Sequence, residues 1–139
     1  MTIKFTIYGN QDNPTGNPVP YVRSTRGALW RKDGKRYAEW KNYVQEQLIP
    51  LILTPETYNE FCKRIAQGKK PIALGKNQKA KMDIKIFWKN RQHGDGDNVW
   101  KGIADALFEN DKNLDGSFES EQSPYGEGRV EVKITIKND

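Results

Sequence analysis

The fold of this chain is decided by Gly94-Asp95-Gly96-Asp97-Asn98-Val99-Trp100-Lys101-Gly102-Ile103-Ala104-Asp105-Ala106-Leu107. The first part of this stretch is a glycine-flanked turn that carries two aspartates, Asp95 and Asp97. The second part repeats apolar residues at helical spacing, which predicts a helix over residues 97–108. We expect Asp97 to be the N-cap of that helix, because a carboxylate there accepts hydrogen bonds from unpaired N–H groups of the first turn.

Two carboxylates beside a lysine are the groups that a divalent-metal phosphodiesterase needs. Mg²⁺ prefers oxygen ligands and is bound by one or two carboxylates, while water and phosphate oxygens complete its shell. Lys101 follows Asp97 by one helical turn, where its ammonium would stabilise negative charge that develops on a phosphate. The same spacing fits a simpler interpretation, in which Asp97 only caps the helix and Asp95 is a solvated turn residue.

Length and composition predict one globular domain with a modest core. The chain has 139 residues, of which 35% are hydrophobic and 29% charged. The lone Cys62 excludes an internal disulfide, and the lone His93 excludes a zinc site built from several histidines. No apolar run approaches the length of a membrane span, and residues 1–4 begin a strand pattern instead of a signal peptide. We therefore expect a cytoplasmic protein.

Charge is divided unevenly along the chain. Residues 1–94 contain 18 Lys and Arg against 7 Asp and Glu, whereas residues 95–139 contain 5 against 11. A basic body that leads to an acidic pocket is typical of a metal-dependent nuclease, because cations attract the DNA backbone and acids hold the metal.

Periodicity predicts an α+β (α/β) fold, a small mixed sheet with helices packed on it. Alternation of apolar and polar residues indicates strands over residues 2–8, 82–89 and 129–137. Helical spacing indicates further helices over residues 37–48 and 54–68, the second starting with Pro55 at its first position. The aspartate turn then follows the end of a strand.

Cations gather before the first predicted helix and again beside the aspartate turn. Interleaved with hydroxyl groups and Trp30, they predict a phosphate-contacting surface, although a solvated loop has a similar composition. The Gly- and Lys-rich residues 68–81 likewise suit either a second DNA-contacting arm or a solvated connection. The predicted DNA-binding residues are Arg23, Arg26, Arg31, Lys32, Lys35, Arg36, Lys89 and Arg91.

A calcium-binding module is an alternative from a different functional class. Residues 111–116 fit Asp-x-Asn-x-Asp-Gly, the opening of an EF-hand loop. The position that needs a bidentate glutamate is Gln122, and the segment that follows contains Pro124, Gly126 and Gly128 instead of a helix.

Two motifs can be compared with a known family. The first is Gly16-Asn17-Pro18-Val19-Pro20, followed by Arg23 and Arg26; the second is Asp95-Gly96-Asp97-Asn98 with Lys101 and Asp105-Ala106-Leu107. They resemble the Gly-x-Pro-x-Pro segment and the Asp-x-Asp-Asn, helical lysine and Asp-Ala-Leu of the RusA family, phage- and prophage-encoded Holliday junction resolvases. The last predicted strand also fits, and residues 54–80 resemble a family-variable insertion within one domain of residues 1–139.

The resemblance implies a homodimeric, Mg²⁺-dependent endodeoxyribonuclease, with Mn²⁺ able to substitute. Such an enzyme resolves four-way DNA junctions by paired symmetric nicks in recombination and repair, in the cytoplasm of a bacterial host. It implies that Asp95 and Asp97 are metal ligands, that Lys101 is the essential helical lysine and that Asn98 supports the turn. It implies neither a membrane partner nor a small-molecule cofactor.

The third carboxylate expected from the resemblance is not fixed by the sequence. The family follows its helix with an Asp-Asp doublet, and here Leu114-Asp115-Gly116 stands at that place. Asp115 aligns with the first acid and Gly116 with the second, so the candidates are Asp115 and Asp111. If the third ligand is lost, a non-catalytic protein that binds branched DNA is the competing hypothesis.

Overall fold

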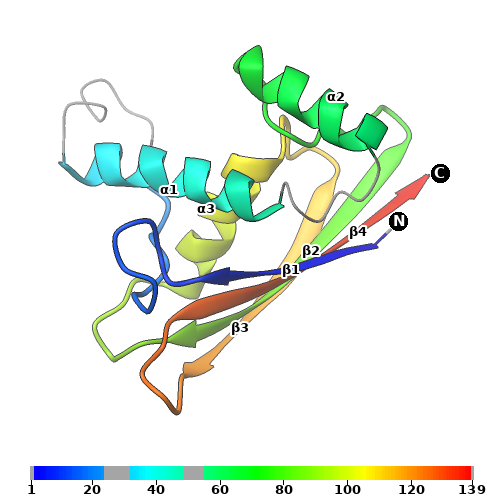
Figure 1. The fold of residues 1–139 in the computed structure, drawn as a ribbon. Coiled ribbons are helices and arrows are strands. Elements are labelled where there is room, and N and C mark those ends of the chain that lie inside the picture. Colours follow the sequence, from blue (N-terminus) through cyan, green and yellow to red (C-terminus); the bar gives the residue numbers. More distant parts are fainter. Residues whose placement is uncertain (1, 24–31, 49–54, 139) are drawn as a thin grey trace.

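The computed structural model describes residues 2–23, 32–48 and 55–138. Its elements, in chain order, are β1 (Thr2–Tyr8), α1 (Lys32–Leu48), α2 (Pro55–Ala66), β2 (Gln78–Trp88), α3 (Gly96–Leu107), β3 (Leu114–Gln122) and β4 (Arg129–Asn138). Figure 1 shows a mixed sheet with helices, which confirms the predicted α+β class. Within the described residues, no helix is both long enough and apolar enough to cross a membrane.

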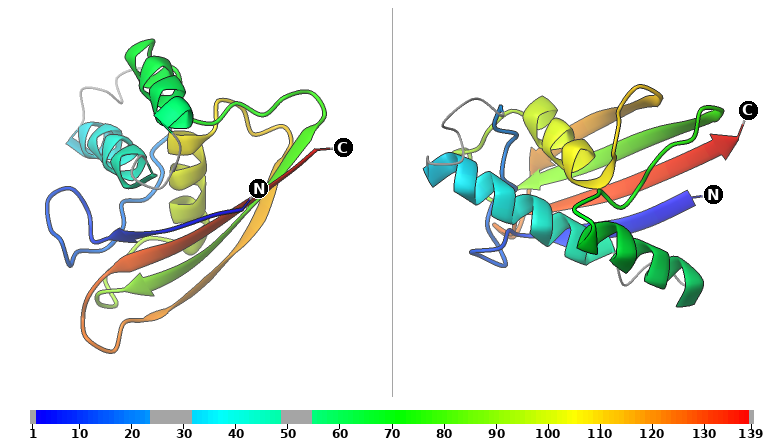
Figure 2. Two further views of the ribbon diagram at one scale, coloured as in Figure 1. Left: turned by 45° about the vertical axis from the view of Figure 1, so that its right-hand side comes forward. Right: turned by 90° about the horizontal axis from the view of Figure 1, so that it is seen from above.

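The four strands lie in the order β1-β4-β2-β3. β4 pairs antiparallel with both β1 and β2, whereas β2 and β3 are parallel. Because parallel neighbours need a crossover connection, the chain leaves β2, passes through α3 and returns as β3. The helices lie on one face of the sheet (Figure 2). The aspartate turn therefore enters a helix that crosses this face between two neighbouring strands.

The core lies between that face and the helices. From β2, the alternating residues Met82, Ile84 and Ile86 are buried. From α1, the predicted stripe of Tyr37, Trp40, Val44 and Leu48 is buried, as are Val99, Ile103 and Leu107 of α3. The apolar periodicity of the sequence thus predicted the inward faces of these elements correctly.

β3 was not predicted from the sequence. Its residues, Leu-Asp-Gly-Ser-Phe-Glu-Ser-Glu-Gln, show no alternation of apolar side chains, and seven of the nine are exposed. The strand forms because its backbone pairs with β2 at the edge of the sheet, not because one of its faces is apolar. Residues 114–122 are therefore extended, so the alternative of an EF-hand loop over residues 111–122 is wrong.

Two further boundaries differ from the sequence-based prediction. β2 begins at Gln78, so the last residues of the Lys-rich segment belong to a strand and not to a loop. α1 begins at Lys32, so Lys32, Lys35 and Arg36 lie on its first turns. α2 begins at Pro55, as predicted from the helix-start signal. Arg26, Trp30 and Arg31 lie outside the described residues.

Candidate active site

The N-cap of α3 is Asp95, two residues before the predicted cap. Its backbone is extended, with φ −77° and ψ 142°, and its carbonyl oxygen accepts hydrogen bonds from the N–H groups of Asn98 at 3.1 Å and Val99 at 3.2 Å. The expectation that Asp97 caps the helix is wrong because the helix already starts at Gly96. The Asp95 side chain makes no capping hydrogen bond. Neither carboxylate therefore caps the start of the helix, and both residues are exposed.

Asp97 and Lys101 form an ion pair on the first turns of α3. The Lys101 Nζ lies 3.1 Å from Oδ2 of Asp97, at the i, i+4 spacing that brings side chains together on a helix. Roughly half of each side chain is exposed, so solvent screening makes the pair a small contributor to stability. The pair matters for chemistry because it holds an ammonium beside a carboxylate at an exposed position that a substrate can reach.

Asp97 and Asp115 line one depression of about 430 Å³. Its other residues are Trp100, Leu114, Gly116, Ser117 and Phe118, so α3 and the start of β3 form its walls. The Oδ1 atom of Asp115 accepts a hydrogen bond of 2.7 Å from the N–H of Gly116. The structure thus brings Asp97 and Asp115 to the same depression, with Lys101 beside Asp97. Asp95 does not line it.

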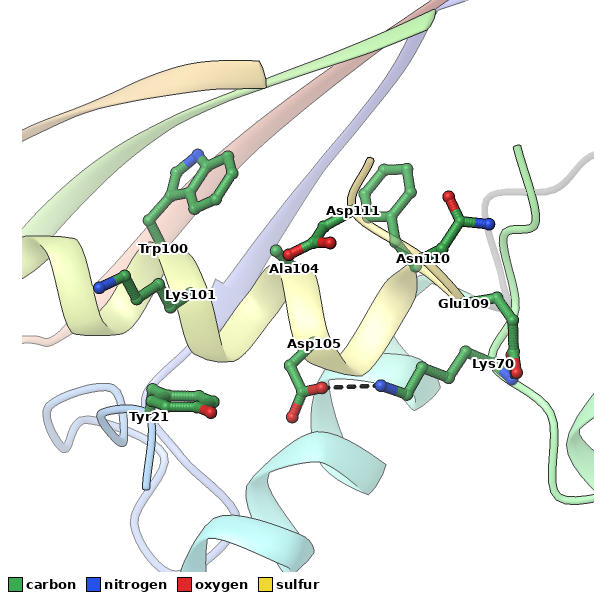
Figure 3. A pocket seen from close by; sticks show the side chains of 10 residues that line it. Tyr21, Lys70, Trp100, Lys101, Ala104, Asp105, Glu109, Asn110 and Asp111 are labelled. Carbon is green, nitrogen blue, oxygen red and sulfur yellow. Dashed lines mark hydrogen bonds and ion pairs between the residues drawn. The ribbon is translucent and has the colours of Figure 1, made fainter. Parts of the chain in front are cut away.

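A second depression, of about 490 Å³, lies further along α3 and contains Asp111 (Figure 3). Trp100 lines both depressions, and Lys101 lines this one. The remaining residues here are Tyr21, Lys70, Ala104, Asp105, Phe108, Glu109 and Asn110. Asp115 and Asp111, the first and second candidates for the third carboxylate, therefore line different depressions.

Gly116 occupies a place that no other residue can take without rearrangement. Its φ is +155°, and a side chain of any kind would bring its Cβ into overlap with the carbonyl oxygen of Met82. Met82 is its partner in the parallel pairing of β2 with β3. The residue that aligns with the second acid of the family doublet is therefore a structural glycine, and an acid cannot replace it in this backbone.

The carboxylates suit a hydrated divalent ion better than a closed metal cage. Across residues 2–23, 32–48 and 55–138, no three His, Cys, Asp or Glu side chains are grouped so that they could hold a metal ion. Two exposed carboxylates, Asp97 and Asp115, nevertheless line one depression. Mg²⁺ is commonly bound in this way, through one or two carboxylates, several waters and the phosphates of the substrate.

The segment from Asn17 to Tyr21 holds the aspartate turn from both sides. The Asn17 amide donates to Oδ1 of Asn90 and to the Gln92 carbonyl oxygen, both at 3.1 Å, and its Oδ1 accepts from the Lys89 N–H at 2.6 Å. The Tyr21 N–H donates to the carbonyl oxygen of Asn98 at 2.9 Å. This segment therefore fixes the loop that leads into α3 and also the first turn of α3.

Comparison with known proteins adds to this geometry. A family model for the endodeoxyribonuclease RusA matches residues 12–136. This chain belongs to the RusA family. The match spans both motifs, the two depressions and the segment that holds the turn, so membership assigns the chain to the endodeoxyribonucleases, in a family that resolves Holliday junctions. No curated protein matches the chain.

Only some of the predicted DNA-binding residues of this RusA-family chain come together. Arg36 and Lys89 line a third depression, of about 470 Å³, together with His93 and Asn17. Arg36 also lies 3.6 Å from Asp12, an exposed pair. Four more predicted residues are exposed in the described part: Arg23, Lys32, Lys35 and Arg91. The role of all of them in DNA binding stays a prediction.

His93 stacks on Trp88 at the end of β2. The ring centroids are 3.8 Å apart and the planes differ by 4°, while Nδ1 lies 2.8 Å from the carbonyl oxygen of Gly94. The stack packs His93 against Trp88 in the loop that leads to Asp95.

Asp105, the acid of the RusA-type Asp-Ala-Leu motif, joins α3 to two other parts of the chain. Its carboxylate accepts hydrogen bonds from the Tyr37 hydroxyl at 2.6 Å and from Lys70 at 2.7 Å, and Lys41 lies 3.4 Å away. Burial alone would raise its pKa, but the hydrogen bonds and the lysine charges outweigh burial and hold the pKa below its usual value. Sequence reasoning missed this network because its members lie far apart in the chain.

Proposed function

We propose that this protein is a Mg²⁺-dependent endonuclease that resolves four-way DNA junctions by paired symmetric nicks. Membership of the RusA family supports the reaction class. One observation supports the site: Asp97 lies 3.1 Å from Lys101 and lines the same depression as Asp115. These are acid and cation groups that phosphodiester hydrolysis uses.

The proposed roles divide between the acids and the lysine. Asp97 and Asp115 would hold the divalent ion, and Asp95, the N-cap two residues before Asp97, is a further proposed ligand. When bound, the ion activates water and offsets negative charge on the phosphate. Lys101 places its ammonium where charge develops on the phosphate oxygens. The depression that Asp97 and Asp115 share favours Asp115 over Asp111 as the third carboxylate.

The basic surface and the symmetry of the substrate complete the proposal. A four-way junction has two-fold symmetry and needs two symmetric cuts, so a C₂ homodimer with one site in each subunit suits it. Cations before α1, on its first turns and after β2 would contact phosphates. They are the exposed Arg23, Lys32, Lys35, Arg36 and Arg91 and the partly exposed Lys89. Arg26 and Arg31 are proposed from the sequence alone.

A second candidate is a protein of the same family that binds branched DNA without cutting it. One observation favours it: no group of three acids in the described chain is placed to hold a metal ion. On this hypothesis, Gly116 stands where a metal ligand has been lost, and the basic surface binds DNA without cleavage.

Cleavage of a labelled synthetic four-way junction separates the two candidates. The reactions contain Mg²⁺, Ca²⁺ or EDTA, and a linear duplex of the same sequence serves as the matched substrate. Paired symmetric nicks in the junction, dependent on Mg²⁺ and absent from the duplex, support the resolvase. Tight junction binding without nicks in any of these conditions supports the binding protein instead.

A further inference from the structure

Lys101 has an acidic residue at each i±4 position of α3. Asp97 precedes it by four residues and Asp105 follows it by four, and both spacings bring side chains together on a helix. The structure shows the ammonium paired with Asp97 at 3.1 Å. In Figure 3, Lys101 points away from Asp105, although both residues line the same depression. Lys101 therefore pairs with only one of its two acidic neighbours on the helix, and Asp105 has other partners.

The two carboxylate oxygens of Asp105 are bound by different partners. Oδ2 accepts from the Tyr37 hydroxyl at 2.6 Å and lies 3.4 Å from the ammonium of Lys41, both on α1. Oδ1 accepts from Lys70 Nζ at 2.7 Å (Figure 3). Side-chain exposure is only 30% for Asp105 and 32% for Lys70, so this pair is better shielded from water than the Lys101 pair.

The backbone around Lys70 is held independently of its ammonium. The Lys70 N–H donates to Oε2 of Glu109 at 2.7 Å, and its carbonyl oxygen accepts from Nε of Arg64 at 2.9 Å. Two residues later, Ile72 exchanges backbone hydrogen bonds of 2.8 Å with Leu107 and Glu109 at the end of α3. Loss of the Lys70 ammonium therefore frees Oδ1 of Asp105 and leaves the loop and the Tyr37 contact in place.

We infer that Lys70 is a positioning residue for the proposed cleavage reaction: by occupying Oδ1 of Asp105, it keeps that carboxylate from pairing with Lys101 and so leaves the Lys101 ammonium beside Asp97. The Lys70 ammonium pairs with Asp105, so Lys70 would act on Lys101 through that carboxylate. The inference rests on the proposed function, because Lys101 matters only if a phosphate is cut beside Asp97.

Steady-state cleavage of the junction, with the junction in saturating excess over enzyme, tests the inference with four variants. Lys70→Met keeps the aliphatic length of the side chain and removes the charge; we expect kcat to fall roughly tenfold, well short of the 10²–10³-fold typical for complete loss of a group that stabilises transition-state charge. Lys70→Met combined with Asp105→Asn removes the competing charge as well, and kcat should recover most of the loss. Lys70→Arg should retain wild-type kcat.

Lys69→Met is the matched control, because it removes the same charge from the neighbouring exposed residue. Any general loss of DNA attraction should weaken binding equally in Lys69→Met and Lys70→Met, whereas the fall in kcat should appear only in Lys70→Met. If the double variant is as slow as Lys70→Met or slower, Lys70 acts by holding the structure together and the inference is overturned.

An NMR measurement keeps this inference separate from the proposed function. In the wild-type protein, contacts between side-chain protons of Lys101 and Asp105 should be absent, and they should appear in Lys70→Met. A wild-type protein that does not cut the junction contradicts the proposed function, but these contacts still report the partner of Lys101. If they remain absent in Lys70→Met, the inference fails whatever the cleavage result.

Discussion

The indole Nε1 of Trp100 donates a hydrogen bond of 2.7 Å to the carbonyl oxygen of Met82. This joins α3 to β2 beneath the depression that contains Asp97 and Asp115. The same carbonyl oxygen fills the space that a Cβ at Gly116 would need. The Met82 carbonyl oxygen of β2 therefore contacts both α3 and β3, and the place of Asp115 in the depression that it shares with Asp97 depends on this close approach.

Gly116→Ala should destabilise the protein strongly. The added methyl group would overlap the Met82 carbonyl oxygen, so β3 must move away from β2 and take Asp115 with it. Gly126→Ala is the matched control, because Gly126 also has a positive φ, of 68°, but no atom lies within 4 Å of the place that its added methyl group would take. Urea unfolding should show a loss of about 1–2 kcal/mol for the control, from the backbone conformation alone, and a clearly larger loss for Gly116→Ala. Equal losses would show that the close approach does not matter.

Asn17→Ala should lower both stability and junction cleavage. The substitution removes three hydrogen bonds to residues 89–92 and leaves the partly buried Lys89 N–H without its partner, at a cost of about 1–3 kcal/mol. Cleavage should fall because this loop leads directly into the aspartate turn. Asn13→Ala provides the comparison within the same N-terminal loop, since its side chain bonds only locally to Thr15. If Asn13→Ala impaired cleavage as much as Asn17→Ala, the bridge to residues 89–92 would not be the cause.

These contacts show which parts of the molecule could be predicted from the sequence. Apolar periodicity identified the inward faces of α1, β2 and α3 because burial requires a repeated pattern along the chain. The edge strand β3 gave no such signal, since its pairing is made by backbone groups while side chains such as Phe118 and Glu119 remain exposed. Local pattern also placed the helix cap at Asp97, although the backbone hydrogen bonds start the helix at Gly96.

The candidate site, like the fold, could be predicted from the sequence only in part. Asp97 and Lys101 could be paired from their spacing alone, because four residues make one helical turn. The choice between Asp111 and Asp115 could not be made, since it depends on how β3 passes the N-terminal half of α3. The network of Asp105 with Tyr37 and Lys70 was likewise invisible, because its members are 68 and 35 residues apart in sequence.

The contribution of Asp105 to stability should depend on pH. Its pKa in the folded protein is lowered, because the hydrogen bonds from Lys70 and Tyr37 and the charge of Lys41 outweigh the effect of burial, which alone would raise it. Its contribution is therefore fully present above the ordinary aspartate pKa and is lost as the pH falls through the lower, folded-state pKa. Hydrogen bonds to a charged group are worth about 1.5–3 kcal/mol, so Asp105→Asn should be less stable than wild type by an amount of this order at pH 7.

Urea unfolding of both proteins at pH 7, 5 and 3 measures this difference. The gap between wild type and Asp105→Asn should be similar at pH 7 and 5 and smaller at pH 3. Asp12→Asn is the control, because Asp12 is largely exposed and its pair with Arg36 is screened by solvent. A gap for Asp105→Asn that grows as the pH falls would contradict the lowered pKa.

Cleavage of a labelled four-way junction in Mg²⁺ by Asp97→Asn, Asp115→Asn and Asp111→Asn, compared with wild type, tests the central claim most directly. Each substitution keeps the size of the side chain and removes one charge, so circular dichroism should confirm that all three proteins fold. We expect paired nicks from wild type and from Asp111→Asn, and a loss of at least about 10²-fold in Asp97→Asn and Asp115→Asn, as is typical when charge stabilisation is removed from a reacting site. Cleavage by Asp97→Asn at the wild-type rate would contradict the assignment of the active site.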